Sequence, residues 1–305
     1  MTVTAADAEL IEVDGREVRV THPDKVLWPS TGMRKRDLIA YDLAISPVLL
    51  PHVGGRGLTL GRWPDGVDGK GWLQAECRGR PEWMRGLRAR SQRTGGVFDY
   101  CVVDDRPGLA WVANLGTIEL HPFPAVAEHP DEPSFVVFDL DPMTPATVVD
   151  AARVAIRLRE TLDALGLPAY VKTSGMFGIH VFVPLAPGET FDRSKAFARR
   201  VAAELAAADP IVTDRMTRRS TRAGRVYVDW LQNDPARSTV AAYSPRAAPY
   251  PFVSTPVRWD EVEGAVASGD RRALYFDLAA VLARVERHGD LFAPVLGPGI
   301  TLPPE

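Results

Sequence analysis

Two aspartates separated by one residue close an apolar run, FVVFDLDP at residues 135–142, and this pair is the strongest chemical signal in the chain. Side chains alternate faces along a strand, so Asp139 and Asp141 point the same way, while the apolar residues before and between them can face a core. Two carboxylates on one face suit a hard divalent cation, and such a pair can hold two ions for in-line phosphoryl transfer. The pair therefore predicts a Mg²⁺ or Mn²⁺ site. The alternative is that the strand ends in a solvent-exposed turn at a proline.

Two further segments carry residue types that suit the same chemistry. Residues 225–231, RVYVDWL, form a second apolar run with one carboxylate, Asp229, and a charge in such a run needs a partner or a metal. Residues 170–183 predict two strands joined by a turn at 174–178, where small residues, backbone N–H groups and a hydroxyl can hold phosphate oxygens. His180 would lie on the following strand beside this turn. Together with three aspartates, the segments indicate a site for a metal and a phosphate.

Seven short strings of the chain resemble the polymerase domain of bacterial DNA ligase D, which belongs to the archaeo-eukaryotic primase superfamily. The strings occur in the order of that family and extend from residue 21 to about residue 260, which makes them far more specific than any single motif. They are residues 21–29, 62–66, 111–122, 138–142, 172–175, 228–233 and 241–246.

The resemblance implies roles for individual residues. The metal-binding and catalytic carboxylates of the family match Asp139, Asp141 and Asp229. The positions around the incoming nucleotide, its sugar and its triphosphate match His121, Ser174, Gly175, His180, Gln232 and Arg246. The positions that hold the 5′-phosphate on the far side of a DNA gap match His22, Lys25 and Lys35.

The resemblance also implies an activity. It is that of a metal-dependent nucleotidyltransferase, a primase-polymerase that extends a primer strand in short DNA gaps or at breaks during end joining. The expected substrates are DNA with a 5′-phosphate and either NTP or dNTP, and the expected cofactor is Mn²⁺ or Mg²⁺ in a two-metal site. The ligase and nuclease modules of some relatives have no counterpart in this chain, so a separate DNA ligase and end-binding repair proteins are the expected partners.

Two departures from the family pattern leave alternatives open. Met176 and Phe177 stand in the turn where the family normally has a lysine, and residues 72–75 lack the lysine that ends the corresponding family string. A non-catalytic module that binds 5′-phosphate ends is therefore one alternative. A phosphatase of the haloacid-dehalogenase type is the other, because it also places Asp-x-Asp after an apolar strand; Met143, however, stands where that class prefers Thr or Val.

Composition sets wider limits. The chain has 305 residues, of which 46% are hydrophobic and 25% charged, so it can bury a sizeable core as one large domain or two fused lobes. A net charge of −3 does not favour binding to nucleic acid, but arginines gather at residues 78–93 and 215–225, and local patches attract phosphates.

Only Cys77 and Cys101 occur, too few for a disulfide framework or a cysteine zinc site. With no signal peptide or membrane span, we expect a cytoplasmic, nucleoid-associated protein without membrane contact.

The predicted elements give an α+β fold. A strand with Asp139, a helix beginning near Thr144, a hairpin, a helix at 192–208 and a strand with Asp229 follow one another, which fits a sheet covered by helices and resembles the RNA-recognition-like catalytic core of primases. The expected domain is the single primase-polymerase domain 1–305, with an N-terminal lobe at about 1–130, a catalytic lobe at about 131–260, and a C-terminal helix and tail at 261–305. Within the first lobe, strands are expected at residues 11–20 and 109–121 and a helix at 34–50.

Overall fold

The computed structural model describes residues 8–91, 94–215, 223–235 and 237–304. The chain forms two compact units, and both are discontinuous in sequence. The first contains residues 1–123, 238–253 and 277–289; the second contains residues 124–237, 254–276 and 290–305. Within the described ranges, no helix is both long enough and apolar enough to cross a membrane.

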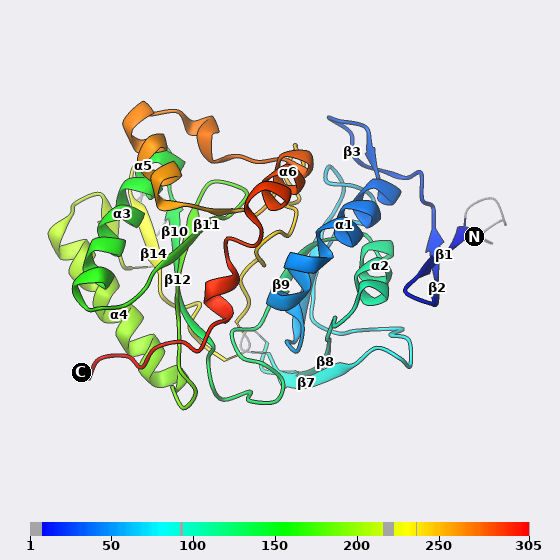
Figure 1. Ribbon diagram of the computed structural model, residues 1–305, viewed down its shortest axis with the longest axis horizontal. Coiled ribbons are helices and arrows are strands. Elements are labelled where there is room, and N and C mark those ends of the chain that lie inside the picture. The colour runs from blue at the N-terminus through cyan, green and yellow to red at the C-terminus, as the bar shows by residue number, and fades with distance from the viewer. Residues whose placement is uncertain (1–7, 92–93, 216–222, 236, 305) are drawn as a thin grey trace. The chain divides into compact units, whose positions relative to one another are not determined.

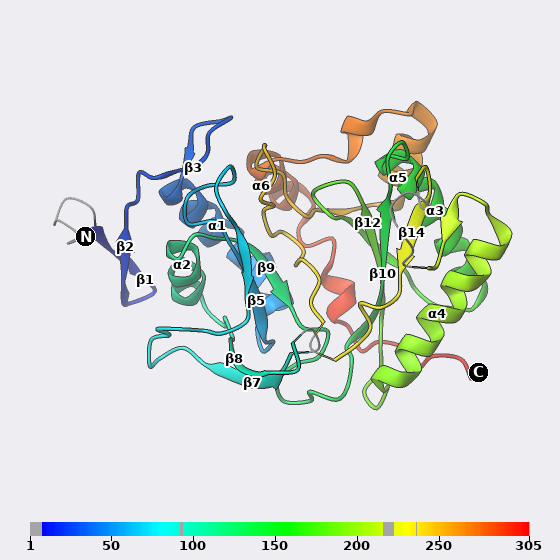
Figure 2. The ribbon, with the colours of Figure 1, turned by 180° about the vertical axis from the view of Figure 1, so that it is seen from behind.

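A six-stranded sheet forms the centre of the second unit (Figures 1 and 2). The strand order is β13, β14, β10, β12, β11, β15, and every pair is antiparallel except β13 with β14. The strands are β10 Phe135–Pro142, β11 Tyr170–Thr173, β12 Ile179–Pro184, β13 Val212–Thr213, β14 Val226–Asp229 and β15 Pro256–Val257.

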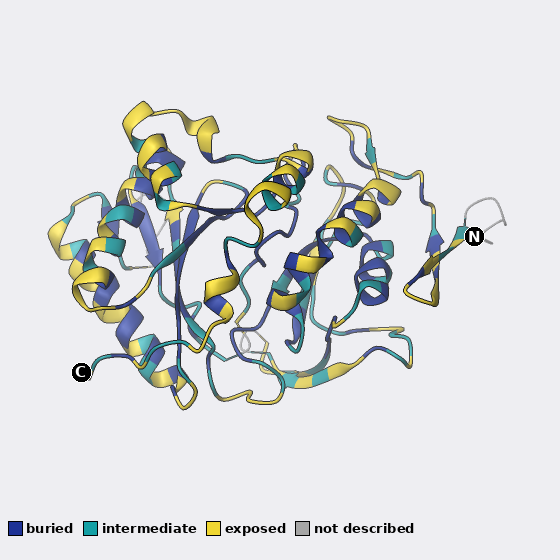
Figure 3. Cartoon of the chain, in the orientation of Figure 1, coloured by how far each residue is buried: buried dark blue, intermediate teal, exposed yellow. Residues whose placement is uncertain are grey.

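Helices α3 (Val148–Ala164), α4 (Phe191–Ala208) and α5 (Trp259–Ser268) supply the core that packs on one face of this sheet. Each of α3 and α4 has a buried stripe and an exposed stripe, as Figure 3 shows. The backbone N–H of Thr147 donates to Asp150 Oδ2 at 2.8 Å and sets the first turn of α3. The described residues of this unit also form the short 3₁₀ helices Arg271–Leu274 and Ala293–Leu296.

Alternation along the strands divides the sheet into an apolar face and a polar face. The residues that pack with the helices on the apolar face include Val136, Phe138 and Leu140 of β10 and Val226 and Val228 of β14. The residues between them in sequence therefore point to the opposite face. That face carries Asp139, Asp141, Lys172, His180, Tyr227 and Asp229.

The described residues of the first unit form a five-stranded sheet, two hairpins and three helices. The sheet has the order β6, β5, β8, β7, with β9 paired to β5. Its strands are β5 Leu58–Arg62, β6 Trp72–Gln74, β7 Gly86–Arg90, β8 Val97–Cys101 and β9 Thr117–Pro122. The hairpins are β1 Ala8–Val13 with β2 Arg16–Thr21 and β3 Val26–Trp28 with β4 Met33–Arg34, and the helices are α1 Lys35–Val53, α2 Arg106–Asn114 and α6 Leu278–His288.

The α+β class and the order strand, helix, hairpin, helix, strand of the second unit are confirmed.

Three local predictions are wrong. Residues 11–20 form a hairpin rather than one strand, because Asp14 and Gly15 adopt positive φ angles of 48° and 78° and reverse the chain. The strand expected at 109–121 is a helix followed by a strand, because Asp105 accepts a hydrogen bond from the N–H of Gly108 and caps α2. Helix α3 begins at Val148, so Thr147 is its cap, rather than Thr144.

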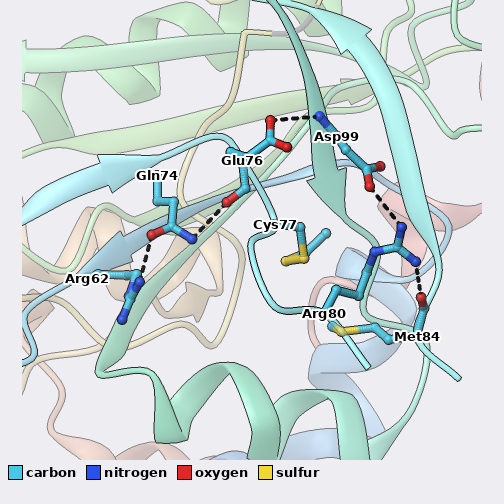
Figure 4. The surroundings of a disulfide bond; sticks show 8 residues. Arg62, Gln74, Glu76, Cys77, Arg80, Met84 and Asp99 are labelled. Atoms are coloured by element: carbon cyan, nitrogen blue, oxygen red, sulfur yellow. Dashed lines mark hydrogen bonds and ion pairs between the residues drawn. A yellow bond between two sulfur atoms is a disulfide. The ribbon is translucent and has the colours of Figure 1, made fainter. Parts of the chain in front are cut away.

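The cysteines also differ from expectation, since Cys77 and Cys101 are joined in a disulfide across 24 positions of the sequence. Figure 4 shows the surrounding polar network. The carboxylate of Asp99 forms an ion pair with Arg80 at 2.8 Å, and the Asp99 N–H donates to Glu76 Oε2 at 3.1 Å. The bond ties the segment after β6 to β8. By restricting the unfolded chain, a loop of this length adds roughly 3 to 4 kcal/mol to stability when oxidised.

Candidate active site

Four side chains stand in one row across the sheet of the second unit. The strand register pairs Lys172 with His180, His180 with Asp139, and Asp139 with Asp229. Directly opposed residues of an antiparallel pair have Cβ atoms roughly 5 Å apart. His180 Nε2 lies 3.1 Å from Asp139 Oδ1, and Lys172 Nζ lies 2.9 Å from His180 Nδ1. The sheet thus brings together three residues predicted for the site and one, Lys172, whose role the sequence did not indicate.

Asp229 is buried within a set of hydrogen-bond donors. Its Oδ1 accepts from the Leu231 N–H at 2.9 Å and from the Tyr227 hydroxyl at 3.2 Å, and its Oδ2 accepts from Gln232 Nε2 at 2.9 Å. Burial, and then the charge of Asp139, raise the pKa of Asp229 above its usual range. Gln232 thus orients Asp229, and its predicted contact with the nucleotide stays a prediction.

Asp141 lies beside the turn that follows β11. A Cβ atom placed on Gly178 would stand 2.6 Å from the Leu140 carbonyl oxygen and 3.4 Å from Asp141 Oδ1. Glycine at this position therefore allows the turn to pass close to the strand that carries both aspartates. The carboxylate of Asp141 and the predicted phosphate-binding turn are neighbours.

Ser174 holds that turn together. Its Oγ accepts from the N–H groups of Met176 at 3.2 Å and of Gly178 at 2.9 Å, and Gly175 adopts a φ of 73°, which glycine tolerates best. The serine hydroxyl and two of the turn's N–H groups thus organise the loop itself. The prediction that this segment holds phosphate oxygens stays a prediction.

The carboxylates fit a divalent cation of the magnesium type. Within the described ranges, no group of three or more His, Cys, Asp or Glu side chains gathers closely enough to enclose a metal by itself. Mg²⁺ is typically held by one or two carboxylates, with water and substrate phosphates as its other ligands. Asp139 and Asp229 are paired directly across adjacent strands, and a cation between them would offset the repulsion that, after burial, raises the Asp229 pKa.

Two other predicted residues lie together in the first unit, around a carboxylate that the sequence reasoning missed. Glu119 Oε2 lies 2.8 Å from His121 Nε2, and Glu119 Oε1 accepts from Arg246 Nε and from the Ala247 N–H, each at 3.0 Å. Burial by itself raises the pKa of Glu119, but the His121 hydrogen bond and the Arg246 charge outweigh it and bring the pKa to about 2. The signal was available, because Glu119 and His121 are two residues apart and share a face of β9.

The predicted 5′-phosphate residues surround the second hairpin of the first unit. The Lys35 N–H donates to the Lys25 carbonyl at 2.9 Å, so the turn returns the chain and places the two lysines side by side at its ends. His22 precedes them with a φ of 48°, and its carbonyl accepts from the Lys25 N–H at 3.1 Å. The three residues thus belong to one local structure.

The two ammonium groups have different environments. Lys25 Nζ forms an exposed ion pair with Asp65 at 2.5 Å, whereas the buried Lys35 Nζ donates to the Thr21 carbonyl at 2.5 Å. Burial, followed by the charges of Lys25 and Arg62, lowers the pKa of Lys35 to about 8. An anion near these groups would relieve their repulsion.

Phe177 does not pack into a core. Its side chain is 65% exposed and lines a cavity of about 290 Å³ together with Arg271 and Tyr275.

In the two arginine-rich segments, Arg80 and Arg85 are paired with Asp99 and Asp104. Four of the other arginines, Arg93, Arg218, Arg219 and Arg222, lie outside the described residues.

A mostly antiparallel sheet with helices on one face and carboxylates on the other is an arrangement suited to nucleotidyl transfer. The family model described as "LigD, primase-polymerase domain" matches residues 34–292, and the chain belongs to this family. The predicted family, and with it the enzyme class of nucleotidyltransferase, are confirmed. Membership of this family also excludes the phosphatase alternative.

Individual relatives agree with this assignment. The chain is 39% identical over 282 residues to the "Multifunctional non-homologous end joining protein LigD" of Mycolicibacterium smegmatis, and the match covers 91% of the chain and 36% of the relative. It is 26% identical over 277 residues to the "Bifunctional non-homologous end joining protein LigD" of Bacillus subtilis, with 90% of the chain and 43% of the relative covered. The chain therefore spans less than half the length of these curated relatives.

A solved structure supports the fold as well. The "Polymerase Domain from Mycobacterium tuberculosis Ligase D in complex with DNA" matches with a TM-score of 0.82 and 32% identity. The match covers 93% of this chain and 99% of that one.

Proposed function

We propose that this chain is a gap-filling primase-polymerase, which adds nucleotides to a primer 3′ end at DNA gaps or breaks that carry a 5′-phosphate. The row of Asp139 and Asp229 on adjacent strands is the observation that carries the proposal. Membership of the primase-polymerase family supports it, as does the likeness to a polymerase domain that was solved in complex with DNA.

Asp139, Asp141 and Asp229 would hold Mg²⁺ or Mn²⁺ at this site. When bound, such ions lower the pKa of an attacking 3′-hydroxyl and neutralise the charge on departing pyrophosphate. The protein itself contributes rigidity, because the carboxylates stand on paired strands and Asp229 is fixed by three donors.

The residues that match the nucleotide-binding positions of the family would contact the incoming nucleotide. In the second unit, Ser174, Gly175 and His180 lie on the turn and strand beside Asp141 and would contact the triphosphate. In the first unit, His121 and Arg246 are held by Glu119, which keeps their donors oriented for sugar or phosphate oxygens. Either NTP or dNTP is a substrate under this proposal.

Lys25, Lys35 and His22 would bind the 5′-phosphate across the gap. Two adjacent ammonium groups favour a terminal phosphate, which carries about −1.5 to −2 charge, over an internal phosphodiester with one. We further propose that a DNA ligase and end-binding repair proteins act with this chain on DNA in the cytoplasm, at the nucleoid.

A primer-extension assay on a gapped duplex tests the proposal. Asp139→Ala should lower the rate of nucleotide addition by about a thousandfold or more, while binding to the gapped DNA is retained. The matched control is Asp163→Ala, since Asp163 is a half-exposed carboxylate of α3 in the same unit, paired with Arg159 at 3.5 Å. Strong extension by Asp139→Ala would exclude the proposed site.

The same assay decides the alternative of a non-catalytic end-binding module. Phe177 in place of a cation favours that alternative, because the turn then has one positive charge fewer for the triphosphate. Binding of 5′-phosphorylated gaps by the wild type, without extension in either Mg²⁺ or Mn²⁺, would establish it.

A further inference from the structure

We propose that Lys172 is a positioning residue that fixes the tautomer and orientation of His180 and, through His180, the carboxylate of Asp139. The inference rests on the proposed function only in assigning Asp139 to the metal site. It concerns a row of hydrogen-bonding groups that runs across the sheet of the second unit, from residue 254 to β10.

Lys172 is almost completely buried, with 1% of its surface exposed. Its Nζ donates to Ser254 Oγ at 2.7 Å and lies 2.9 Å from His180 Nδ1, and it stands 5.7 Å from the centre of the Phe182 ring. A buried ammonium is costly unless it is bonded, and these contacts offset that cost. A lysine on the surface would avoid this desolvation cost, so the burial of Lys172 needs a functional explanation.

The direction of each hydrogen bond can be assigned from Ser254. Its hydroxyl has one hydrogen, which it donates to the Thr173 carbonyl at 2.9 Å, so it must accept the bond from Lys172. An ammonium has three donors and no acceptor, so Lys172 also donates to His180 Nδ1.

A neutral imidazole that accepts at Nδ1 carries its hydrogen on Nε2. His180 Nε2 is the atom that lies 3.1 Å from Asp139 Oδ1. Lys172 therefore selects the tautomer whose N–H faces the carboxylate. The hydrogen then lies on the side of the ring that faces Asp139 Oδ1, where it can orient the carboxylate beside Asp229.

Orientation of a metal ligand by such outer partners commonly changes metal affinity or activity by about 10- to 100-fold. Lys172 acts one group further out than a direct partner of the ligand, so the lower end of this range applies. Lys172→Met, which keeps the length of the side chain and removes its donors, should weaken Mn²⁺ binding by about tenfold. Lys172→Arg, which keeps donors, should recover part of that loss.

The experiment combines ¹⁵N NMR of the histidine rings with Mn²⁺ titration of the full chain. The His180 ring signals are assigned as those missing from His180→Gln. In the wild type they should show hydrogen on Nε2, and in Lys172→Met they should show loss of this fixed tautomer. Lys195→Met is the matched control, because Lys195 pairs with Asp234 at 2.6 Å in the same unit, and it should leave both measurements unchanged.

Two outcomes would overturn the inference. One is a wild-type ring with its hydrogen on Nδ1, a result that needs no variant and so stands even if Lys172→Met fails to fold. The other is a folded Lys172→Met protein with unchanged tautomer and unchanged Mn²⁺ affinity. Neither readout requires polymerisation, so absence of primer extension by the wild type would reject the proposed function separately.

Discussion

Each unit of the molecule contains a buried carboxylate in its candidate site, and the two have opposite electrostatic environments. Asp229 in the second unit is 6% exposed and faces another carboxylate, and its pKa is raised by burial and by that neighbour. Glu119 in the first unit is 5% exposed and lies between His121 and Arg246, which bring its pKa to about 2. The two carboxyl groups are similarly buried, but their pKa values shift in opposite directions because the neighbouring charges differ in sign.

The difference predicts that Asp229 serves the chemistry of the site and that Glu119 serves its structure. A carboxylate held near another carboxylate lowers stability unless a cation is added. A carboxylate that pairs with a guanidinium and an imidazole stabilises the charges around it. Substitutions at these two sites should therefore change activity and stability in different proportions.

The largest effect is expected at Asp229. Asp229→Asn removes a proposed metal ligand and should lower the rate of primer extension by about 10²- to 10³-fold. Because folding raises the pKa of this carboxyl, the folded state is disfavoured as pH rises through that pKa, and the uncharged amide escapes this cost. Without added metal, the melting temperature of the variant at neutral pH should equal or exceed that of the wild type. A large fall in melting temperature would show that Asp229 is a structural group.

Glu119→Gln should show the opposite pattern. It leaves Arg246 and His121 beside an uncharged amide, and loss of one member of a buried pair costs about 3 kcal/mol. Because folding lowers the pKa of Glu119, its stabilising effect holds at neutral pH and is lost only as pH falls toward 2. Denaturant unfolding at pH 7 measures the loss. Glu263→Gln removes an exposed partner of Arg159 and should change stability by less than about 1 kcal/mol.

The segments predicted to bind phosphate extend the same comparison, because the second unit has an aromatic where the family has a cation. Phe177 is largely exposed, so Phe177→Lys can be accommodated without repacking and should tighten nucleotide binding by about 1 to 3 kcal/mol if the amine reaches a phosphate. The measurement is the apparent nucleotide affinity in primer extension. Unchanged or weaker affinity would mean that this turn does not contact the triphosphate.

The smallest effect is expected from pH at Lys35. Since its pKa is about 8, the charge on Lys35 is present below pH 8 and is lost as the pH rises past it. The preference for 5′-phosphorylated over unphosphorylated gaps should fall by up to about tenfold between pH 7 and pH 9. Lys35→Arg keeps its charge and should flatten this dependence. An equally steep profile in both proteins would assign the titration to another group.

Much of the second unit could be predicted from local sequence. Alternation placed Asp139 and Asp141 on one face of a strand, and apolar stripes predicted the helices that cover the other face. These inferences succeed because the two-residue period of a strand and the 3.6-residue period of a helix are properties of neighbouring residues. The resemblance to a known family then supplied roles for residues that periodicity alone could not assign.

The tertiary structure decided which distant residues meet. The alignment of Lys172, His180, Asp139 and Asp229 depends on the register of three strand pairs, and a slip of one residue in any strand would turn that strand's side chain to the other face. The bond between Glu119 and Arg246 joins positions 127 residues apart, and the return of residues 238–253 and 277–289 to the first unit has no local signal. Periodicity determines which face of its own strand or helix a side chain occupies. Which residue lies opposite it is determined by the pairing of strands and helices, and that pairing depends on the packing of the whole core.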